Sequence, residues 1–361
     1  MLRMTALTAV AATLCLAAPV PAHAQAVDFS GRTITALVGY AAGGAVDIFA
    51  RLVANHVSAH IPGKPRIIVE NKPGAGGVVA ANYLYNVARK DGSVFLVTIS
   101  PFTNQFISEG KVGFDTAKFN WLAALDYSNT MYLRSDLGVR TPADLAKARQ
   151  QIVVGGLTNY SPRDLHMRAF LEAAGHKKYK YVSGYQGTLP IRIALLRGEV
   201  NFNDESALTM ITDLAPYIKD GSIVPLVQSG VLQDGRKVRD PQLPHVPTAH
   251  EAVIALRGEA IRKTVEYRAF DLVASMISLG RGIFMPPGVD PAVAATLRTA
   301  FGKLNDDPEF QKSAAKLTGG PKMELTGGAV AQKFAENFTS LATSDPAALQ
   351  YLENMAKGRD R

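Results

Sequence analysis

The sequence predicts an α/β protein of two lobes, each a mostly parallel sheet flanked by helices. Two observations carry this prediction. Short β-branched segments alternate with segments whose apolar residues recur at helical spacing, a pattern typical of parallel sheets covered on both faces. The chain also has 361 residues, whereas a single domain usually holds roughly 100–200. We therefore expect two lobes with a cleft between them.

The first lobe is predicted from the alternation in the N-terminal part. Expected strands span 33–38, 66–70 and 94–99, and expected helices span 48–61 and 78–89. The second lobe follows the same pattern. Its expected strands are 152–155, 178–182, 200–203 and 223–228, and its expected helices are 142–150, 162–174, 189–197 and 208–219.

The rest of the chain is expected to return to the first lobe. Residues 232–250 are rich in proline and polar residues, which indicates a long surface connection. Helices are expected at 291–304, 308–317, 330–341 and 346–357, around a short strand at 322–325. The predicted domains are a signal peptide at 1–24, lobe 1 at 25–131 plus 230–361, and lobe 2 at 132–229.

The first 24 residues have the features of an export signal. Arg3 gives a basic start, residues 7–20 form an apolar run, and Ala22-His23-Ala24 matches the small-x-small cleavage pattern. The run is shorter than the ~18 residues typical of a membrane-spanning helix. We therefore expect an exported protein that is cleaved near Ala24.

Composition excludes several classes of site. Cys15 is the only cysteine and lies in the export signal, so the mature chain has no disulfide, cysteine-ligated metal or cysteine nucleophile. The formal net charge is +8, but lysine and arginine are scattered and form no basic stripe interleaved with aromatic residues. Nucleic acid is therefore not an expected partner.

A glycine loop, Gly39-Tyr-Ala-Ala-Gly-Gly-Ala-Val-Asp47, joins the first expected strand to the first expected helix. Glycine exposes backbone N–H groups, and the N-terminus of a helix favours a phosphate or a carboxylate. A plain turn capped by Asp47 is the alternative. The spacing matches neither G-x-G-x-x-G nor G-x-x-x-x-G-K-[ST], so a dinucleotide or P-loop site is poorly supported.

Polar loops also follow the strands of the second lobe, where ligands of open α/β sheets bind. Thr158, Asn159 and Ser161 can donate to a carboxylate, and Ser161 is also a plausible N-cap before Pro162. Arg163 is expected to be solvated, with an anion pair as the alternative. Asp204-Glu205 either projects into the cleft or caps the helix from Leu208.

Patterns that indicate an enzyme or a metal site are weak. Neither G-x-S-x-G nor H-E-x-x-H occurs. His56 and His60 are four residues apart, which could serve a metal, but a packed or helix-end histidine fits their apolar stripe better. Asp306-Asp307 precedes Pro308 and indicates a helix start. We expect no catalytic residue, metal or cofactor.

Seven short motifs in this chain recur together in one family. They are Gly39 to Arg51, Glu70 to Gly77, Lys90 to Gly92, Gly184 to Gly187 with Pro190, Leu196 to Val200, Leu243 to Thr248 and Phe284 to Gly288. In this order they occur in the substrate-binding receptors of tripartite tricarboxylate transporters, also called Bug receptors. The chain resembles that family over nearly its whole mature length.

The resemblance implies a type II-like periplasmic binding protein that closes on a small organic carboxylate. Such a receptor has no catalytic activity and no cofactor, and it delivers its ligand to membrane permease subunits. Glycine loops of both lobes hold the ligand carboxylate through amides, hydroxyls and water. The ligand-binding residues carried over are Tyr40, Gly43, Gly44, Asp47, Thr103, Thr158, Asn159, Ser161, Tyr185, Gly187 and Asp204.

The chain departs from the family pattern at three places. Tyr40 to Ala42 stand where many members have proline and phenylalanine, Gln186 stands where lysine or arginine is frequent, and residues 256–278 lengthen the return segment. These departures leave the identity of the carboxylate open. Asp204-Glu205 suggests a ligand that also carries a hydrogen-bond donor.

Three alternatives remain at this point. A TRAP-type receptor would hold the carboxylate with a buried arginine, and an exported α/β hydrolase would need a nucleophile and a base in the cleft. A receptor could also report to a sensor protein. We expect a monomer that closes by hinge motion near Met131 to Leu133 and Leu226 to Ser229.

Overall fold

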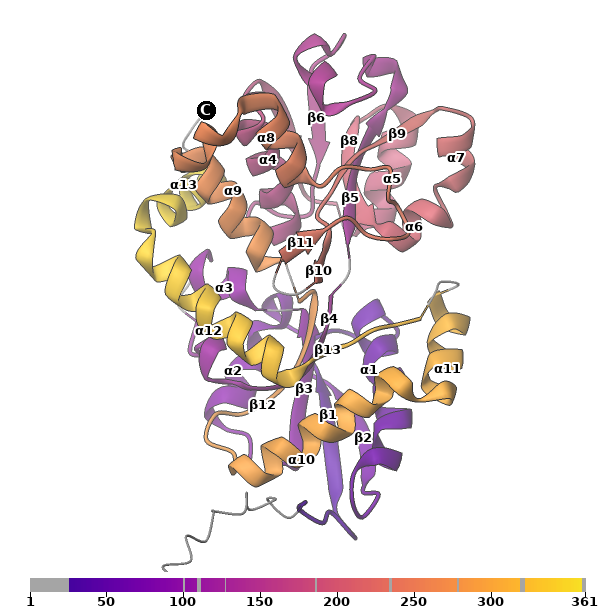
Figure 1. Ribbon diagram of the computed structural model, residues 1–361, viewed down its shortest axis with the longest axis vertical. Helices are drawn as coiled ribbons and strands as arrows, with labels where there is room; N and C mark the ends of the chain where they lie inside the picture. The colour runs from indigo at the N-terminus through magenta and orange to yellow at the C-terminus, as the bar shows by residue number, and fades with distance from the viewer. Residues whose placement is uncertain are drawn as a thin grey trace, which may run out of the picture.

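The computed structural model describes residues 26–99, 101–108, 112–126, 128–185, 187–233, 236–277, 279–318 and 322–358. The described chain forms two lobes, each built around one sheet (Figure 1). The predicted signal peptide lies outside these residues. Within the ranges given, no helix has both the length and the apolar character needed to cross a membrane.

Lobe 1 contains the first three expected strands. Its strands are β1 (Thr33–Val38), β2 (Arg66–Asn71), β3 (Val94–Ile99), β4 (Asn120–Leu125), β12 (Arg281–Met285) and β13 (Thr326–Gly327). Its helices are α1 (Ala45–Val57), α2 (Val78–Asn86), α3 (Phe102–Phe106), α10 (Pro291–Gly302), α11 (Pro308–Thr318) and α12 (Gly328–Ser344).

Lobe 2 is formed mainly by the middle of the chain. Its strands are β5 (Asn129–Arg134), β6 (Ile152–Gly155), β7 (Tyr179–Val182), β8 (Phe202–Ser206) and β9 (Ile223–Gln228). Its helices are α4 (Pro162–Ala173), α5 (Thr188–Arg197), α6 (Ala207–Ile211) and α7 (Ala215–Lys219). A hairpin and three more helices follow, which are β10 (Val231–Gln233), β11 (Arg236–Val238), α8 (Ala249–Arg257), α9 (Val265–Met276) and α13 (Pro346–Lys357).

Strand directions determine which loops face the other lobe. In lobe 1, β1 is parallel to β2 and β3, and β12 is antiparallel to both β3 and β4. Strands β1 to β4 therefore run one way, and β4 ends where the chain enters lobe 2. In lobe 2, β5 leads away from lobe 1, while β8, β6 and β7 run back toward it. The carboxyl ends of both sets of strands thus point at the opposite lobe.

The two-lobe α/β fold is confirmed, but the sheets are mixed rather than mostly parallel. The strand orders are β13-β4-β12-β3-β1-β2 and β7-β6-β8-β5-β9. Strands β12, β13 and β5 run against their neighbours, because the chain leaves lobe 1 after β4 and returns to it at β12.

Several predicted elements differ from the observed ones. Strands β4 and β12 were not predicted, and the strand expected at 322–325 is absent from that segment. The helix expected at 208–219 is divided into α6 and α7, because Thr212 departs from helical geometry at φ −109° and ψ −85°. The helix expected at 142–150 is a 3-10 helix at Pro142–Lys147.

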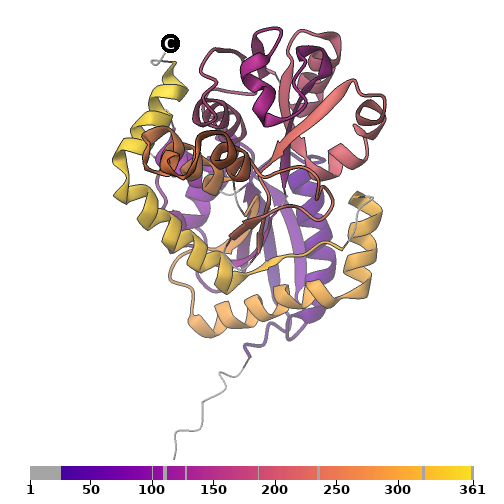
Figure 2. The same cartoon turned by 45° about the horizontal axis from the view of Figure 1, so that its top comes forward.

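The core connects the two lobes on one side. One buried cluster includes Leu96 and Trp121 of lobe 1 together with Met131 and Phe170 of lobe 2. The other face of each sheet packs separately, against α1 and α10 in lobe 1 and against α5 in lobe 2. Figure 2 shows α12 and α13, in yellow, extending along the connected side. The lobes therefore share a buried core along this side.

The predicted domain limits stay a prediction, and the packing differs from them in the C-terminal part. Helices α8, α9 and α13 pack around α4 of lobe 2, although 230–361 was assigned to lobe 1. The predicted hinge positions also stay a prediction. Met131 to Leu133 and Leu226 to Gln228 lie inside the paired strands β5 and β9, where ladder hydrogen bonds hold them. The links outside the sheets join Leu125 to Asn129 and Gln228 to Val231.

Candidate functional site

The predicted ligand loops lie at the edges where the two lobes face each other. In lobe 1, the first glycine loop follows β1, a second glycine loop at 72–77 follows β2, and Thr103 follows β3. In lobe 2, residues 156–161 follow β6, residues 183–185 and Gly187 follow β7, and Asp204 lies near the end of β8. Ligands of α/β sheets bind beyond such carboxyl ends. The fold thus directs both groups of loops toward the opposite lobe.

Asp47 fastens the first loop to lobe 1. It is the third residue of α1, and its side chain is only 2% exposed. Its Oδ2 accepts hydrogen bonds from Gly43 N and Arg51 Nε, both at 2.9 Å, and its Oδ1 accepts one from Asn71 Nδ2 at 2.9 Å. The hydrogen bond from Arg51 lowers the pKa of Asp47 to about 2. Asp47 is therefore ionised, and both oxygens are engaged within the lobe.

The glycines of lobe 1 serve different purposes. Gly43 has φ +78° and, like Gly44, is exposed; the first amides of α1 beside them have no acceptor inside the helix. Gly39 is packed, because a Cβ there would lie 2.7 Å from Thr98 Oγ1. A Cβ on Gly77 would lie 2.5 Å from the same oxygen. Only glycines let the two loops approach each other here. Gly43 and Gly44 are exposed, and their amides donate to Asp47 Oδ2 and to the Ala41 carbonyl.

Three further hydroxyl groups lie at the lobe 1 edge. The Tyr40 hydroxyl donates to the Gly76 carbonyl at 2.9 Å, which ties the first loop to the second. Thr98 and Thr103 are each 1% exposed, and their hydroxyl oxygens have no hydrogen-bond partner in the described part of the chain. The prediction selected Tyr40 and Thr103 but missed Thr98, which looks like an ordinary β-branched strand residue in the sequence.

Asp164 organises the second loop as Asp47 organises the first. It is the third residue of α4 and is fully buried. Its Oδ2 accepts from Leu157 N at 2.5 Å and from Thr158 N at 3.2 Å, and burial raises the pKa of Asp164. The sequence analysis missed Asp164, although its spacing from Ser161 is that of a capping box.

The predicted residues of the second loop divide into two groups. Ser161 is the N-cap of α4, because its hydroxyl accepts from Asp164 N at 3.4 Å. Thr158 and Asn159 have exposed side chains. Two amides of this loop are occupied by Asp164, so the exposed side chains are what it offers to a ligand.

The third loop is joined to the second. Gly184 N donates to Leu157 O at 3.0 Å, and Tyr185 N donates to Gly156 O at 3.3 Å. The hydroxyl of Tyr181, which was not predicted, donates to Thr158 O at 2.8 Å and to Asp164 Oδ2 at 3.0 Å. Gly187, with φ +143°, is the N-cap of α5. The loops after β6 and β7 therefore form one unit.

Arg163 was expected to be solvated, and this prediction is wrong. Its side chain is 11% exposed, because the first turn of α4 packs beside the acceptors at the end of β8. Its Nε donates to the Asp204 carbonyl at 3.1 Å, and its other nitrogens bind Asp164 and Asn203. The guanidinium is therefore occupied by groups of the chain itself.

Asp204 and Glu205 have different environments. Glu205 accepts from Arg192 at 2.9 and 2.7 Å and from the Tyr132 hydroxyl at 3.1 Å. Asp204 is 1% exposed, and burial raises its pKa to about 7. The alternative that this pair caps the following helix is wrong, because Ser206 is the N-cap of α6.

The two histidines of α1 and its 3-10 extension contact groups of lobe 1. His56 packs edge-on against Phe310 with ring centroids 5.8 Å apart, and His60 Nε2 lies 2.7 Å from Asp307 Oδ2. Asp307 also accepts from Glu309 N and Phe310 N, which confirms the predicted helix start. In the ranges that the structure describes, no three His, Cys, Asp or Glu residues are arranged to hold a metal ion.

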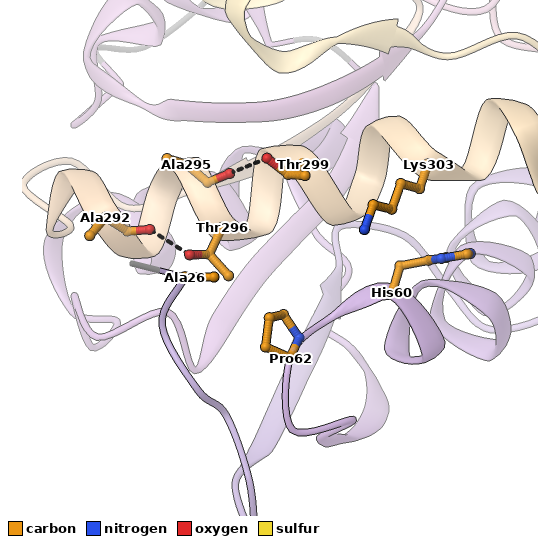
Figure 3. A pocket seen from close by; sticks show the side chains of 8 residues that line it. All are labelled: Ala26, His60, Pro62, Ala292, Ala295, Thr296, Thr299 and Lys303. Atoms are coloured by element: carbon orange, nitrogen blue, oxygen red, sulfur yellow. Dashed lines mark hydrogen bonds between the residues drawn. The ribbon is translucent and has the colours of Figure 1, made fainter. Parts of the chain in front are cut away.

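Two cavities lie away from the facing edges. The larger, of about 180 Å³, is on lobe 1 beside α10, where Lys303, Thr299 and His60 contribute to its lining (Figure 3). The smaller, of about 70 Å³, lies near Pro142 and His176. None of the predicted site residues lines either cavity.

Comparison with known proteins identifies the family. Residues 49–325 match the Tripartite tricarboxylate transporter family receptor, TctC. The chain is similar to the UPF0065 protein in the gbd 5' region of Cupriavidus necator, with 31% identity over 322 residues, which is 86% of each chain.

Solved structures share the fold at lower identity. A TctC solute binding protein from Polaromonas is 22% identical with a TM-score of 0.63, over 87% of this chain and 99% of the other. MatC from Rhodopseudomonas palustris with bound malate is 20% identical with a TM-score of 0.58, over 91% and 100%. Because the family match covers most of the chain and the fold agrees, this protein belongs to the receptor family of the tripartite tricarboxylate transporters.

Proposed function

We propose that this receptor binds a small organic carboxylate between its lobes outside the cytoplasm and delivers it to the permease of a tripartite tricarboxylate transporter. The observation that carries the proposal is the pair of helix-starting loops, one after β1 and one after β6, at edges that face each other. Helix starts and glycine loops favour carboxylates. The malate bound to MatC supports the same ligand class.

The proposed site has two kinds of residue. Some residues contact the ligand, including the buried Thr103 and Asp204, whereas others hold the loops in place. The proposed contacts are Gly43, Gly44, Thr103, Thr158, Asn159, Tyr185 and Gly187, with Asp204 at the far end of the ligand. Tyr40, Asp47 and Ser161 contribute by fixing the two loops through the hydrogen bonds described above.

The receptor is proposed to act without catalysis, as a periplasmic monomer cleaved near Ala24. A TRAP-type site would use a buried arginine for the ligand carboxylate. Arg163 is buried at the correct edge, but Asp164, Asn203 and the Asp204 carbonyl engage its nitrogens. Loop amides and hydroxyls are therefore the better anchor for a carboxylate here.

A thermal-shift screen of the mature chain from Gln25 tests the proposal, after refolding to remove any bound ligand. The panel contains mono-, di- and tricarboxylates, aromatic acids and neutral sugars. A ligand that binds only the folded state raises the melting temperature. We expect a rise confined to one class of carboxylates. A response to sugars with none to any acid would contradict the proposal.

A variant pair locates the site. Thr158→Ala/Asn159→Ala removes two exposed side chains, so we expect unchanged stability and an affinity for the responding acid lowered by about tenfold, equivalent to ~1.4 kcal/mol. Thr299→Ala, on the exposed surface of α10, is the matched control and should bind like the wild type. Equal affinities in both variants would place the site elsewhere.

A further inference from the structure

Asp204 is a buried carboxylate with an unused oxygen at the edge of lobe 2 that faces lobe 1. The residue is 1% exposed, and its Oδ1 has no hydrogen-bond partner among the described residues. Arg163 Nε lies 3.7 Å from Oδ1, beyond hydrogen-bond distance, and donates to the Asp204 carbonyl at 3.1 Å. A buried carboxylate oxygen without a hydrogen-bond donor costs free energy, so a donor supplied by a ligand would be stabilised at this position.

The charges around Asp204 also favour a positively charged donor. Four carboxylates share two guanidinium groups: Asp164 and Asp204 lie against Arg163, and Glu205 and Asp213 lie against Arg192. Asp213 is 58% exposed and is well solvated, but Asp164, Asp204 and Glu205 are buried. With all groups ionised the network is negative. A positive group brought by a ligand would therefore be stabilised there.

We infer that the ligand of this receptor carries an ammonium group as well as a carboxylate, and that Asp204 binds the ammonium. The inference rests on the proposed function, since it assumes that the carboxylate binds at the loops between the lobes. An ammonium group has three N–H donors and a full charge, which satisfies both the unused oxygen and the charge balance. The ligand class is thus an amino acid or another aminocarboxylate.

Matched ligand pairs test the inference by titration calorimetry at pH 8 on refolded mature protein. The pairs are L-aspartate and succinate, L-glutamate and glutarate, and 4-aminobutyrate and butyrate, which differ only in the amino group. We expect the amino member of at least one pair to bind at least tenfold more tightly than its partner. Asp204→Asn should remove that preference by weakening the binding of the amino member.

Asp213→Asn is the matched control, because it removes a carboxylate from the same network at an exposed position. It should keep the preference for the amino member. An unchanged preference in folded Asp204→Asn, or no preference in the wild type, would overturn the inference. If only plain carboxylates bind, the proposed function stands and the ammonium site fails; if no acid of any kind binds, both fail. The wild-type pairs decide the question even if Asp204→Asn does not fold.

Discussion

At the scale of single residues, Asp47 and Asp164 occupy equivalent positions in the two lobes. Each is the third residue of a helix that follows a loop, and each accepts hydrogen bonds from amides of that loop. Arg51 supports the first carboxylate, and Arg163 supports the second. Because the chain's own carboxylates fix these loops, little ordering entropy is lost when a ligand binds.

Asp204 should make stability depend on pH. Burial raises its pKa to about 7 from 3.8, with Arg163 and Asp164 facing it from α4, Glu205 beside it on β8 and Asn129 from β5. The folded state therefore holds the proton more tightly, and the contribution of Asp204 to the free energy of unfolding is full below pH 4 and is lost as pH rises through 7. We expect Asp204→Asn to gain about 1–3 kcal/mol over wild type between pH 5 and pH 8.

Urea unfolding at the two pH values measures this difference. Asp213→Asn is the control, since Arg192 lowers the pKa of Asp213 and its linkage is complete below pH 5. Its stability relative to wild type should be the same at pH 5 and pH 8. An Asp204→Asn profile parallel to wild type would mean that Asp204 ionises normally.

At the scale of elements, β7 holds the second ligand loop through Tyr181. Tyr181→Phe removes the hydrogen bonds to Thr158 O and Asp164 Oδ2. We expect a loss of about 1 kcal/mol in the free energy of unfolding, and an affinity for the carboxylate lowered by about threefold to tenfold as the loop loosens. Calorimetry with the acid found in the thermal-shift screen measures the affinity.

Tyr179→Phe is the matched control, because Tyr179 is on the same strand and donates to Glu172 at 2.7 Å, away from the loop. It should lose similar stability and keep its affinity. If both variants bind as tightly as wild type, Tyr181 does not position the loop.

The two glycine loops of lobe 1 pack through Gly39. Gly39→Ala places a Cβ 2.7 Å from Thr98 Oγ1 and 3.2 Å from the Gly77 Cα, so we expect the free energy of unfolding to fall by about 1–3 kcal/mol. Gly302→Ala, at the end of α10 with no atom within 4 Å of the new Cβ, should leave stability unchanged or raise it by up to about 1 kcal/mol. Urea unfolding compares the two, and equal effects would refute the close approach of the loops.

Helices and strands whose apolar residues recur at a regular spacing were predictable from the sequence. The segments that became β1, β3 and α1 combine β-branched or amphipathic runs with glycine boundaries, and their observed limits lie close to the predicted ones. Strand β12 was missed because its run, Arg281 to Met285, is short, begins with a charge and contains a glycine, so its place depends on partners far away in the chain. Strand β12 pairs with β3 and β4, which lie more than 150 residues earlier in the chain, so no local pattern indicates it.

In the candidate site, too, features set by neighbouring residues were predictable and features set by distant contacts were not. Local patterns indicated the loops, since glycine and Ser-Pro signals depend on a few neighbouring residues. The burial of Arg163 and the donors around Asp204 depend on how α4 packs beside β8, about 40 residues further on in sequence. Contacts of that kind leave no periodic signal, which is why Arg163 was misjudged.

At the scale of the whole molecule, the lobes share a core on one side and are linked elsewhere by short segments. The shared cluster joins α9, α12 and α13 to both sheets, whereas the α1 and α5 sides have separate cores. We therefore expect motion between the lobes to open and close the side where the predicted ligand loops face each other, with bending at or beside the links after β4 and β9.

Lys237 on β11 binds both of these links. Its Nζ lies 3.5 Å from Asp126 Oδ2, just after β4, and donates to the Gly230 carbonyl, just after β9, at 3.1 Å. The two side chains are 16% and 8% exposed. Lys237→Met would leave Asp126 buried beside an apolar group, so we expect a loss of about 3–5 kcal/mol in the free energy of unfolding.

The double variant Lys237→Met/Asp126→Leu removes both charges and should recover most of that loss, because a buried ion pair and an apolar pair of similar size have similar stability. Lys322→Met is the control: its pair with Asp306 is exposed at 52% and 90%, so a change below about 1 kcal/mol is expected. Urea unfolding of the three variants and the wild type separates the cases. A double variant as unstable as the single one would show that the lysine holds the links by its bond to Gly230 rather than by its charge, and that the ion pair does not secure the junction of the lobes.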